Sequence, residues 1–388
     1  MAMNPSVITL GSWLGLSLVL TSCGGKASSD AAATDGSSCQ GPSFEPAGPT
    51  IDVTSIFNYT AGFWAAAEDA GRFAFVSDSY GGGGPWLILF DGQGVKLTET
   101  LLAGQDGGLG VTRAHGIASD GTRFGLLSED WDGATRSLVR FRLLDENGAG
   151  VEPPVDLGPP GENGSLGAVL WAGNGWLAVW SRGSPTDSEL WLAVLAADGA
   201  LTRAPNALLG GRELTRPRMA RTSSGVTAIA WQTSQGVSWV RLESDGSLGA
   251  VSQFAVGPTG ALSMAASDRE FVVGWSDTSG ASGDIVRLGE DGTIRCGPRR
   301  AAFAPGAFAA SGATMVGVGT RLFGSSASSV EIFNVLEDCT FGPSVTVANK
   351  GGADSVNVAD GSVLVTWLEG ALQSMNVRAR VVRPSCFE

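Results

Sequence analysis

Residues 267–294 read SDREFVVGWSDTSGASGDIVRLGEDGTI. Two short apolar runs, FVVGW and IVRL, flank a loop of Ser, Asp, Thr, Ala and Gly, and an Asp-Gly turn follows the second run. Runs of four to eight residues rich in Val, Ile, Phe and Trp between turn residues are typical of β-strands. The stretch therefore predicts two antiparallel strands that end in a tight turn.

The same pattern returns along the chain, as GNGWLAVWSRGSPTDSELWLAVLAADGAL at 173–201 and SSGVTAIAWQTSQGVSWVRLESDGSL at 223–248. The turn before the first apolar run recurs seven times, about 48 residues apart on average, at Gly71, Gly121, Gly175, Gly225, Arg269, Gly319 and Gly361. Short strands in repeats of this length indicate the blades of a β-propeller. We expect an all-β, seven-bladed β-propeller with four antiparallel strands per blade. Six blades are the alternative, because the unit from Ala313 to Gly342 has no Trp.

Several strand positions follow from the repeat. Tryptophans take equivalent places near the end of the second strand of four units, at Trp180, Trp231, Trp275 and Trp367. The Asp-Gly pairs suit two-residue hairpins, which need positive φ. The last unit stops after its third strand, at Met375–Val382, which would leave an unpaired edge. We therefore expect Ile51–Ser55 to pair with that strand and close the ring.

The repeated W-S-D, loop and D-I-V-R-L-x-x-D-G elements resemble the tandem repeats of secreted bacterial propellers. The resemblance covers residues 51–388 and implies a fold and a location in the cell envelope. Because that family carries no single activity, the resemblance implies no reaction.

The N-terminus reads as an export signal. The apolar run Val7–Leu20 is too short to span a bilayer and fits a signal peptide. The following Leu-Thr-Ser-Cys resembles a lipobox, which implies cleavage before Cys23 and lipid on its thiol. Gly24, by resemblance to bacterial sorting rules, favours the outer membrane. The alternative is an ordinary signal peptide with a chance cysteine.

The predicted domains are a lipoprotein signal peptide at 1–22, a lipidated Cys23 with a flexible tether at 23–50, and the propeller at 51–388. The tether is rich in Gly, Ser, Ala, Asp and Pro and has no apolar period. The predicted membrane contact is therefore the lipid anchor.

Four other cysteines allow three disulfide pairings. Cys296 and Cys339 follow third strands of neighbouring units, whereas Cys39 precedes the closing strand and Cys386 follows its partner strand. We predict the bridges Cys296–Cys339 and Cys39–Cys386. A zinc site is the alternative, but the sequence contains no C-x-x-C spacing.

The net charge of -13 argues against a nucleic-acid or anionic-membrane partner, because phosphate binding requires clustered basic charge. One His and two Tyr leave few groups for acid–base chemistry near neutral pH. We expect a monomer without a metal or cofactor.

The candidate ligand face carries the loops between second and third strands, where propellers commonly bind. Its residues are Asp78, Glu129, Asp130, Asp187, Asp277 and Asp284, with His115, Arg216 and Arg218 expected beside the central channel. Because Asp is a default turn residue, solvated turns are the simpler interpretation of the acids. Alternating strand positions place Arg216 and Arg218 on one face, where they could bind a carboxylate, although surface solvation also explains them.

The preferred function is non-catalytic: a lipid-anchored envelope propeller that binds a protein or a polysaccharide as a binding or scaffold protein. The alternative is a glycosidase or polysaccharide lyase that uses two carboxylates from the acidic loops. Convergence of two acids over a deep pocket would favour the enzyme.

Overall fold

The computed structural model describes residues 44–384, with gaps. The gaps are 47–48, 58–64, 70, 78–84, 103–110, 132–136, 159–166, 185–186, 212, 244–245, 256, 258, 302, 312–313, 324–326, 360–361 and 372–373. Asp78 and three of the predicted cysteines (Cys23, Cys39 and Cys386) lie outside the described residues, so the lipid anchor and the Cys39–Cys386 bridge stay predictions. The described residues contain no helix long and apolar enough to cross a bilayer.

Seven antiparallel sheets follow one another along the chain. Blade 1 consists of β3 (Ala65–Asp69), β4 (Arg72–Ser77), β5 (Trp86–Asp91) and β6 (Lys96–Leu101). Blade 2 consists of β7 (Val111–Ser119), β8 (Phe124–Trp131), β9 (Ser137–Leu144) and β10 (Val155–Asp156). Blade 3 consists of β11 (Gly167–Trp171), β12 (Gly175–Ser184), β13 (Asp187–Ala196) and β14 (Asn206–Gly211). Blade 4 consists of β15 (Thr215–Arg221), β16 (Thr227–Thr233), β17 (Gly236–Leu242) and β18 (Ser252–Ala255).

The remaining blades follow the same order. Blade 5 consists of β19 (Thr259–Ala266), β20 (Glu270–Asp277), β21 (Gly283–Gly289) and β22 (Ile294–Ala301). Blade 6 consists of β23 (Ala304–Ser311), β24 (Thr314–Phe323), β25 (Ala327–Val335) and β26 (Val345–Ala348). Blade 7 consists of β27 (Gly352–Ala359), β28 (Ser362–Ala371) and β29 (Ser374–Pro384), with β1 (Phe44–Pro46) and β2 (Ile51–Phe57) from the other end of the sequence.

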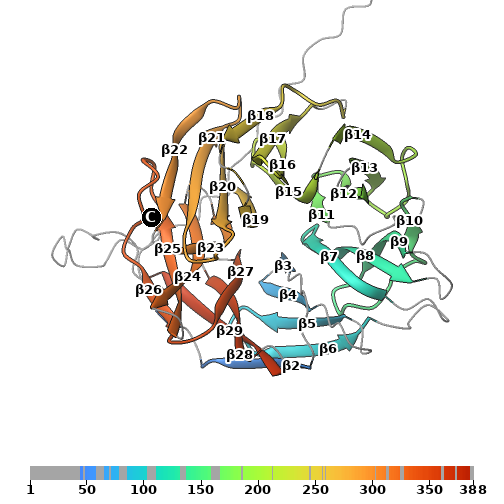
Figure 1. Cartoon of the computed structure of the whole chain (residues 1–388). Coiled ribbons are helices and arrows are strands. Elements are labelled where there is room, and N and C mark those ends of the chain that lie inside the picture. Colours follow the sequence, from blue (N-terminus) through green and yellow to red (C-terminus); the bar gives the residue numbers. More distant parts are fainter. Residues whose placement is uncertain are drawn as a thin grey trace, which may run out of the picture. The chain divides into compact units, whose positions relative to one another are not determined.

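The blades are arranged around an axis. The first strand of each blade contacts the first strand of the next, and β27 of blade 7 contacts β3 of blade 1, which completes the circle (Figure 1). The seven-bladed prediction is confirmed. The six-bladed alternative is wrong, because the unit without Trp forms a complete blade from β23 to β26.

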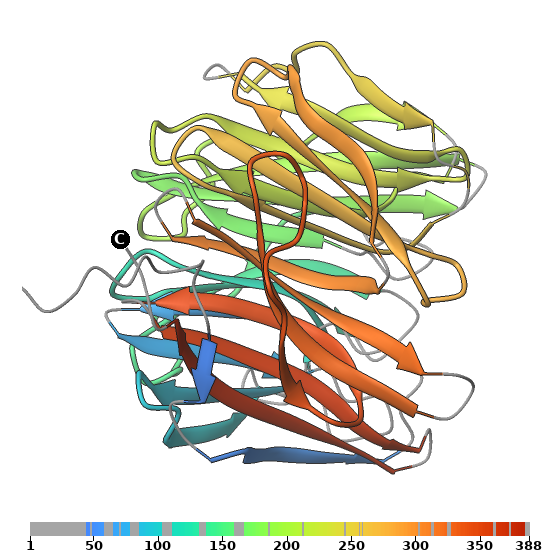
Figure 2. The ribbon, with the colours of Figure 1, turned by 90° about the vertical axis from the view of Figure 1, so that its left-hand side faces the viewer.

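Two N-terminal strands complete blade 7. β2 pairs antiparallel with β29 from Ile51 opposite Ala379 to Phe57 opposite Ser374, which confirms the predicted closure. β1, which was not predicted, continues the same edge, with Phe44 opposite Pro384. Figure 2 shows these blue strands beside the red C-terminal strands. The outer strand of blade 7 thus comes in two pieces from the start of the sequence.

The core lies between neighbouring blades. The equivalent tryptophans Trp180, Trp231, Trp275 and Trp367 are at most 2% exposed. Trp275 stacks on Phe254 of blade 4 with ring centroids 5.8 Å apart. Because each blade buries both of its faces, the second and third strands are rich in large apolar residues on either side of the sheet.

The turns between third and fourth strands differ from the predicted two-residue hairpins. In blade 3, the Gly199 N–H donates to the Ala196 carbonyl and the Ala196 N–H to the Ala200 carbonyl. This is a three-residue loop whose last residue, Gly199, has a φ of 86°. In blade 6 the equivalent residue is Cys339, at a φ of 60°.

Cys339, at this glycine position, forms a disulfide. The bridge to Cys296 has a Cα–Cα distance of 5.7 Å and confirms that part of the prediction. It joins the outer strand of blade 5 to the turn between β25 and β26 of blade 6. No cluster of three metal-ligating side chains occurs in the described parts of the chain.

Candidate functional site

Two predicted loop acids lie inside a strand instead. Glu129 and Asp130 belong to β8 and are 4% and 0% exposed. Neighbouring strand residues point to opposite faces of a sheet, so the two carboxylates do not converge. The interpretation of these residues as solvated turn acids is therefore wrong, because β8 continues to Trp131.

Asp130 is the centre of a buried ion-pair cluster in blade 2. One of its carboxylate oxygens accepts from Arg140 Nη1 at 3.0 Å and from Arg142 Nη2 at 2.5 Å, and Ser128 Oγ donates to the other at 3.1 Å. Arg140 also donates to Asp156 at 2.6 Å. Burial raises the pKa of Asp130 despite the two arginines. The cluster binds β8, β9 and β10 together and leaves Asp130 without access to solvent.

His115 and Glu129 lie together on the other side of β8. His115 Nε2 is 3.3 Å from Glu129 Oε2, and the two side chains are 0% and 6% exposed. His115 comes from the innermost strand β7, as predicted, but its ring is enclosed. Enclosure prevents a ligand in the central channel from reaching the imidazole.

Asp277 and Asp284 do converge, but an arginine lies between them. Arg300 Nη2 is 2.8 Å from Asp277 and its Nη1 is 3.1 Å from Asp284. Hydroxyl donors on Ser279 and Ser282 hold the pKa of Asp277 well below its usual range. A carboxyl that stays ionised cannot serve as the general acid that glycoside hydrolysis requires.

The other predicted residues are dispersed. Asp187 is exposed at the start of β13. Arg216 donates to the Gly260 carbonyl at 2.5 Å and Arg218 to the Leu262 carbonyl at 3.2 Å. Both arginines thus bind blade 4 to the inner strand of blade 5.

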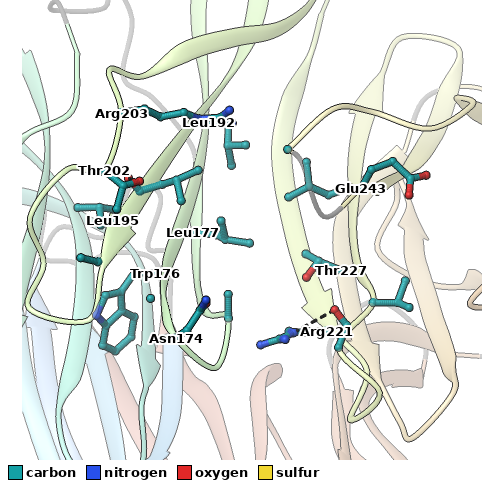
Figure 3. A pocket seen from close by; sticks show the side chains of 18 of the residues that line it. Asn174, Trp176, Leu177, Leu192, Leu195, Thr202, Arg203, Arg221, Thr227 and Glu243 are labelled. Carbon is teal, nitrogen blue, oxygen red and sulfur yellow. Dashed lines mark hydrogen bonds between the residues drawn. The ribbon is translucent and has the colours of Figure 1, made fainter. Parts of the chain in front are cut away.

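A cleft lies elsewhere, between blades 3 and 4 (Figure 3). This interblade cleft has a volume of about 750 Å³, within the range of small-molecule sites. It opens where β11 turns into β12 and β15 into β16, at the ends of the blades away from the acidic loops. Its lining comprises Ala172, Asn174, Gly175, Trp176, Leu177, Leu192, Val194, Leu195, Ala196, Thr202, Arg203, Arg221, Gly225, Val226, Thr227, Arg241, Leu242, Glu243 and Gly246.

Aliphatic side chains form the floor of the cleft. Leu177 and Leu192 of blade 3 pack against Leu242 of blade 4, and Val194 lies beside them. Leu192 is fully buried, and the other two leucines are 8% exposed. Trp176 is the sole aromatic residue of the described lining, and its 0% exposure leaves no ring face for a ligand.

Two arginines from facing blades lie at the ends of this floor (Figure 3). Arg203 of blade 3 reaches blade 4, where a Cβ on Gly246 would lie 2.5 Å from its Nη2. Arg221 of blade 4 reaches blade 3, where a Cβ on Gly173 would lie 2.8 Å from its Nη1. The missing side chains at these two glycines make room for the guanidinium groups.

Among the described residues, no carboxylate neutralises the charge of these two arginines. Arg221 Nε donates to the Gly225 carbonyl at 3.2 Å, and among the described residues no carboxylate pairs with either arginine. Glu243 pairs instead with Arg241, whose Nη2 is 2.6 Å from it. The cleft is therefore a cationic, apolar-floored site in a chain of net charge -13.

No protein-family model and no curated protein sequence matches the chain. Solved structures match its fold. A polysaccharide lyase, Uly1, superposes with a TM-score of 0.53 at 12% identity, over 84% of this chain and 92% of the lyase. The β-propeller domain of Cps50 (Swd1) from Myceliophteria thermophila superposes with a TM-score of 0.50 at 10% identity, over 84% and 99%. The Dos1 propeller superposes with a TM-score of 0.50 at 11% identity, over 85% of this chain and 95% of that propeller.

At these identities the matches show the propeller fold alone. Since one fold carries many functions, the function must be argued from the site.

Proposed function

We propose that the protein is a non-catalytic binding propeller of the bacterial cell envelope and that an anionic ligand occupies the interblade cleft. The observation that carries this proposal is the pair Arg203 and Arg221, which extend from facing blades over an apolar floor and have no carboxylate partner among the described residues. Guanidinium groups form strong, directional hydrogen bonds with carboxylate, phosphate and sulfate groups.

The acidic balance of the chain supports a local site. Net negative charge repels anions from most of the surface, so the cationic cleft is the place where an anion gains attraction. The apolar floor strengthens that attraction, because charges interact more strongly beside a low-dielectric wall than in open water.

The states of the carboxylates favour binding over catalysis. Asp130 and Glu129 are enclosed, and Asp277 and Asp284 share Arg300. Neither pair offers an accessible acid and base facing one substrate. A binding or scaffold role requires neither an accessible acid nor an accessible base.

The envelope location rests on the lipobox-like Leu-Thr-Ser-Cys before Gly24. Incorporation of radiolabelled palmitate during expression in a bacterial host tests it. The natural chain should carry the label and pellet with the outer membrane, and Cys23→Ser should lose both properties. An unlabelled natural chain would exclude the lipid anchor.

The cleft is tested by titrating polyglutamate and oligogalacturonate, two polyanions with different backbones, and following intrinsic fluorescence. At least one should bind the natural protein, and binding should weaken at high salt because the contact is ionic. The double variant R203Q/R221Q should lose that binding, while R295Q, which removes an exposed arginine of β22 outside the cleft, should keep it. Equal binding by R203Q/R221Q and the natural protein would refute the assignment of the cleft.

A further inference from the structure

From the chemistry of the cleft floor we infer that the ligand is an acidic peptide segment in which two carboxylate side chains flank aliphatic side chains. This inference rests on the proposed function and specifies the ligand class of the same site. Between the two arginines lies a surface of leucines and valine, and a ligand that joins the two guanidinium groups must cover it (Figure 3).

A glycan suits that surface poorly. Each sugar ring carries several hydroxyl groups, and a hydroxyl that is buried without a hydrogen-bond partner destabilises the complex. Leu177, Leu192 and Leu242 offer no hydrogen-bonding group, and the Trp176 indole is enclosed. An acidic polysaccharide would satisfy the arginines but would lose its hydroxyl hydration over the floor.

An aliphatic peptide side chain strengthens binding over the apolar floor, whereas a sugar hydroxyl weakens it. Burying a leucine or valine side chain stabilises the complex through the hydrophobic effect. Val194 is half-buried, and Leu177 and Leu242 each keep 8% of their surface exposed, so the floor still has some apolar surface to cover. The floor therefore selects for aliphatic side chains between the two charges.

The polar groups of the rim match a peptide backbone. The Asn174 amide is exposed and carries both a donor and an acceptor, the same pair that a peptide group presents. Thr202 is exposed, and its Oγ1 donates to the Val194 carbonyl at 2.9 Å, so its lone pairs can accept from a ligand N–H. Each end of the cleft thus combines one guanidinium with one neutral hydrogen-bonding group: Arg203 with Thr202, and Arg221 with Asn174.

The test uses the full chain and a fluorescein-labelled, capped peptide of sequence Glu-Leu-Ser-Val-Glu, followed by fluorescence anisotropy. We expect saturable binding that weakens about tenfold in R203Q and in R221Q, since a charge-assisted hydrogen bond is lost in each. R295Q should bind as the natural chain does. On the ligand side, the Glu→Gln peptide should lose binding at both arginines, and the peptide with Leu and Val replaced by Ser should bind about tenfold more weakly.

The outcomes separate this inference from the proposed function. If oligogalacturonate binds with dependence on Arg203 and Arg221 and the peptide does not, the ligand is a glycan and the peptide inference is overturned, while the anion-binding cleft stands. If the peptide binds equally well with Ser in place of Leu and Val, the floor does not select and the inference is also overturned. If neither polyanion nor peptide responds to the arginine variants, both proposals fail.

Discussion

The disulfide between Cys296 and Cys339 gives a prediction with a defined magnitude. It joins blades 5 and 6 across a sequence separation of 43 residues. In the loop-entropy model a bridge of this span stabilises the folded chain by about 4 kcal/mol, because it restricts the unfolded ensemble. Reduction should therefore lower the free energy of unfolding by about that amount.

The measurement needs a variant in which Cys296–Cys339 is the one predicted bridge that can still form. The variant C39A/C386A removes the second predicted bridge. Urea unfolding of this variant, followed by the fluorescence of its 12 tryptophans, should show the loss when the reductant TCEP is added. The further variant C296A/C339A, in the same background, is the control: its unfolding should not respond to reductant.

Reduction keeps both sulfur atoms, although the two thiols move apart from bonding distance, so no cavity is left at the buried Cys339 and the comparison reports mainly the loss of the covalent link. A loss below about 1 kcal/mol would refute the reasoning, because it would mean that the unfolded chain gains little freedom when the bridge opens.

Three further predictions concern the ring, the core and pH. A chain that starts after Phe57 lacks β1 and β2 and exposes the edge of β29, so size-exclusion chromatography should show self-association, whereas a chain that starts at Gly41 should elute as a monomer. Trp275→Ala, at a position 1% exposed, should lower the free energy of unfolding by about 3–5 kcal/mol, whereas Val251→Ala, at a position 54% exposed, should change it by less than about 0.5 kcal/mol in the same urea titration. The pKa of Asp277 is depressed in the folded protein, so its ionised form stabilises the fold above about pH 5, and this contribution is lost as the pH falls through and below 3.8, the usual pKa of Asp. The difference in unfolding free energy between the natural chain and Asp277→Asn should therefore shrink from pH 7 to pH 3. A constant difference would contradict the role of Ser279 and Ser282.

Most of the fold could be predicted because a propeller repeats one local pattern. Each blade needs only neighbouring strands joined by short turns, and the turn residues mark those boundaries in the sequence. The closure by Ile51–Ser55 and the Cys296–Cys339 bridge followed from counting strands in equivalent units. β1 could not be predicted, because Phe44–Pro46 is short and lies in a stretch whose composition reads as a tether.

The site residues were harder to predict because burial depends on strand length. Glu129 and Asp130 resemble loop acids in sequence, but β8 continues past them and Arg140 and Arg142 of β9 neutralise Asp130. The composition of a segment does not show where a strand will end.

The interblade cleft was missed because its two arginines come from different repeats. Arg221 ends the first strand of blade 4 and Arg203 follows the third strand of blade 3. A signal was available: in a propeller, the turns after first and third strands emerge on the same face. Arginines beside those turns in consecutive repeats could have been compared with one another.

The pairing of β1 and β2 with β29 also sets the order of events when the chain is made. The strand pieces at residues 44–57 are synthesised more than 300 residues before their partner strand β29, which begins at Ser374. At about 5–20 residues per second, roughly 20–70 s separate the two. During that interval β1 and β2 lack their partner strand, so blades 1 to 6 can assemble before blade 7 is complete. A premature stop before β29 would therefore yield an incomplete propeller with an unpaired strand edge that is prone to aggregation.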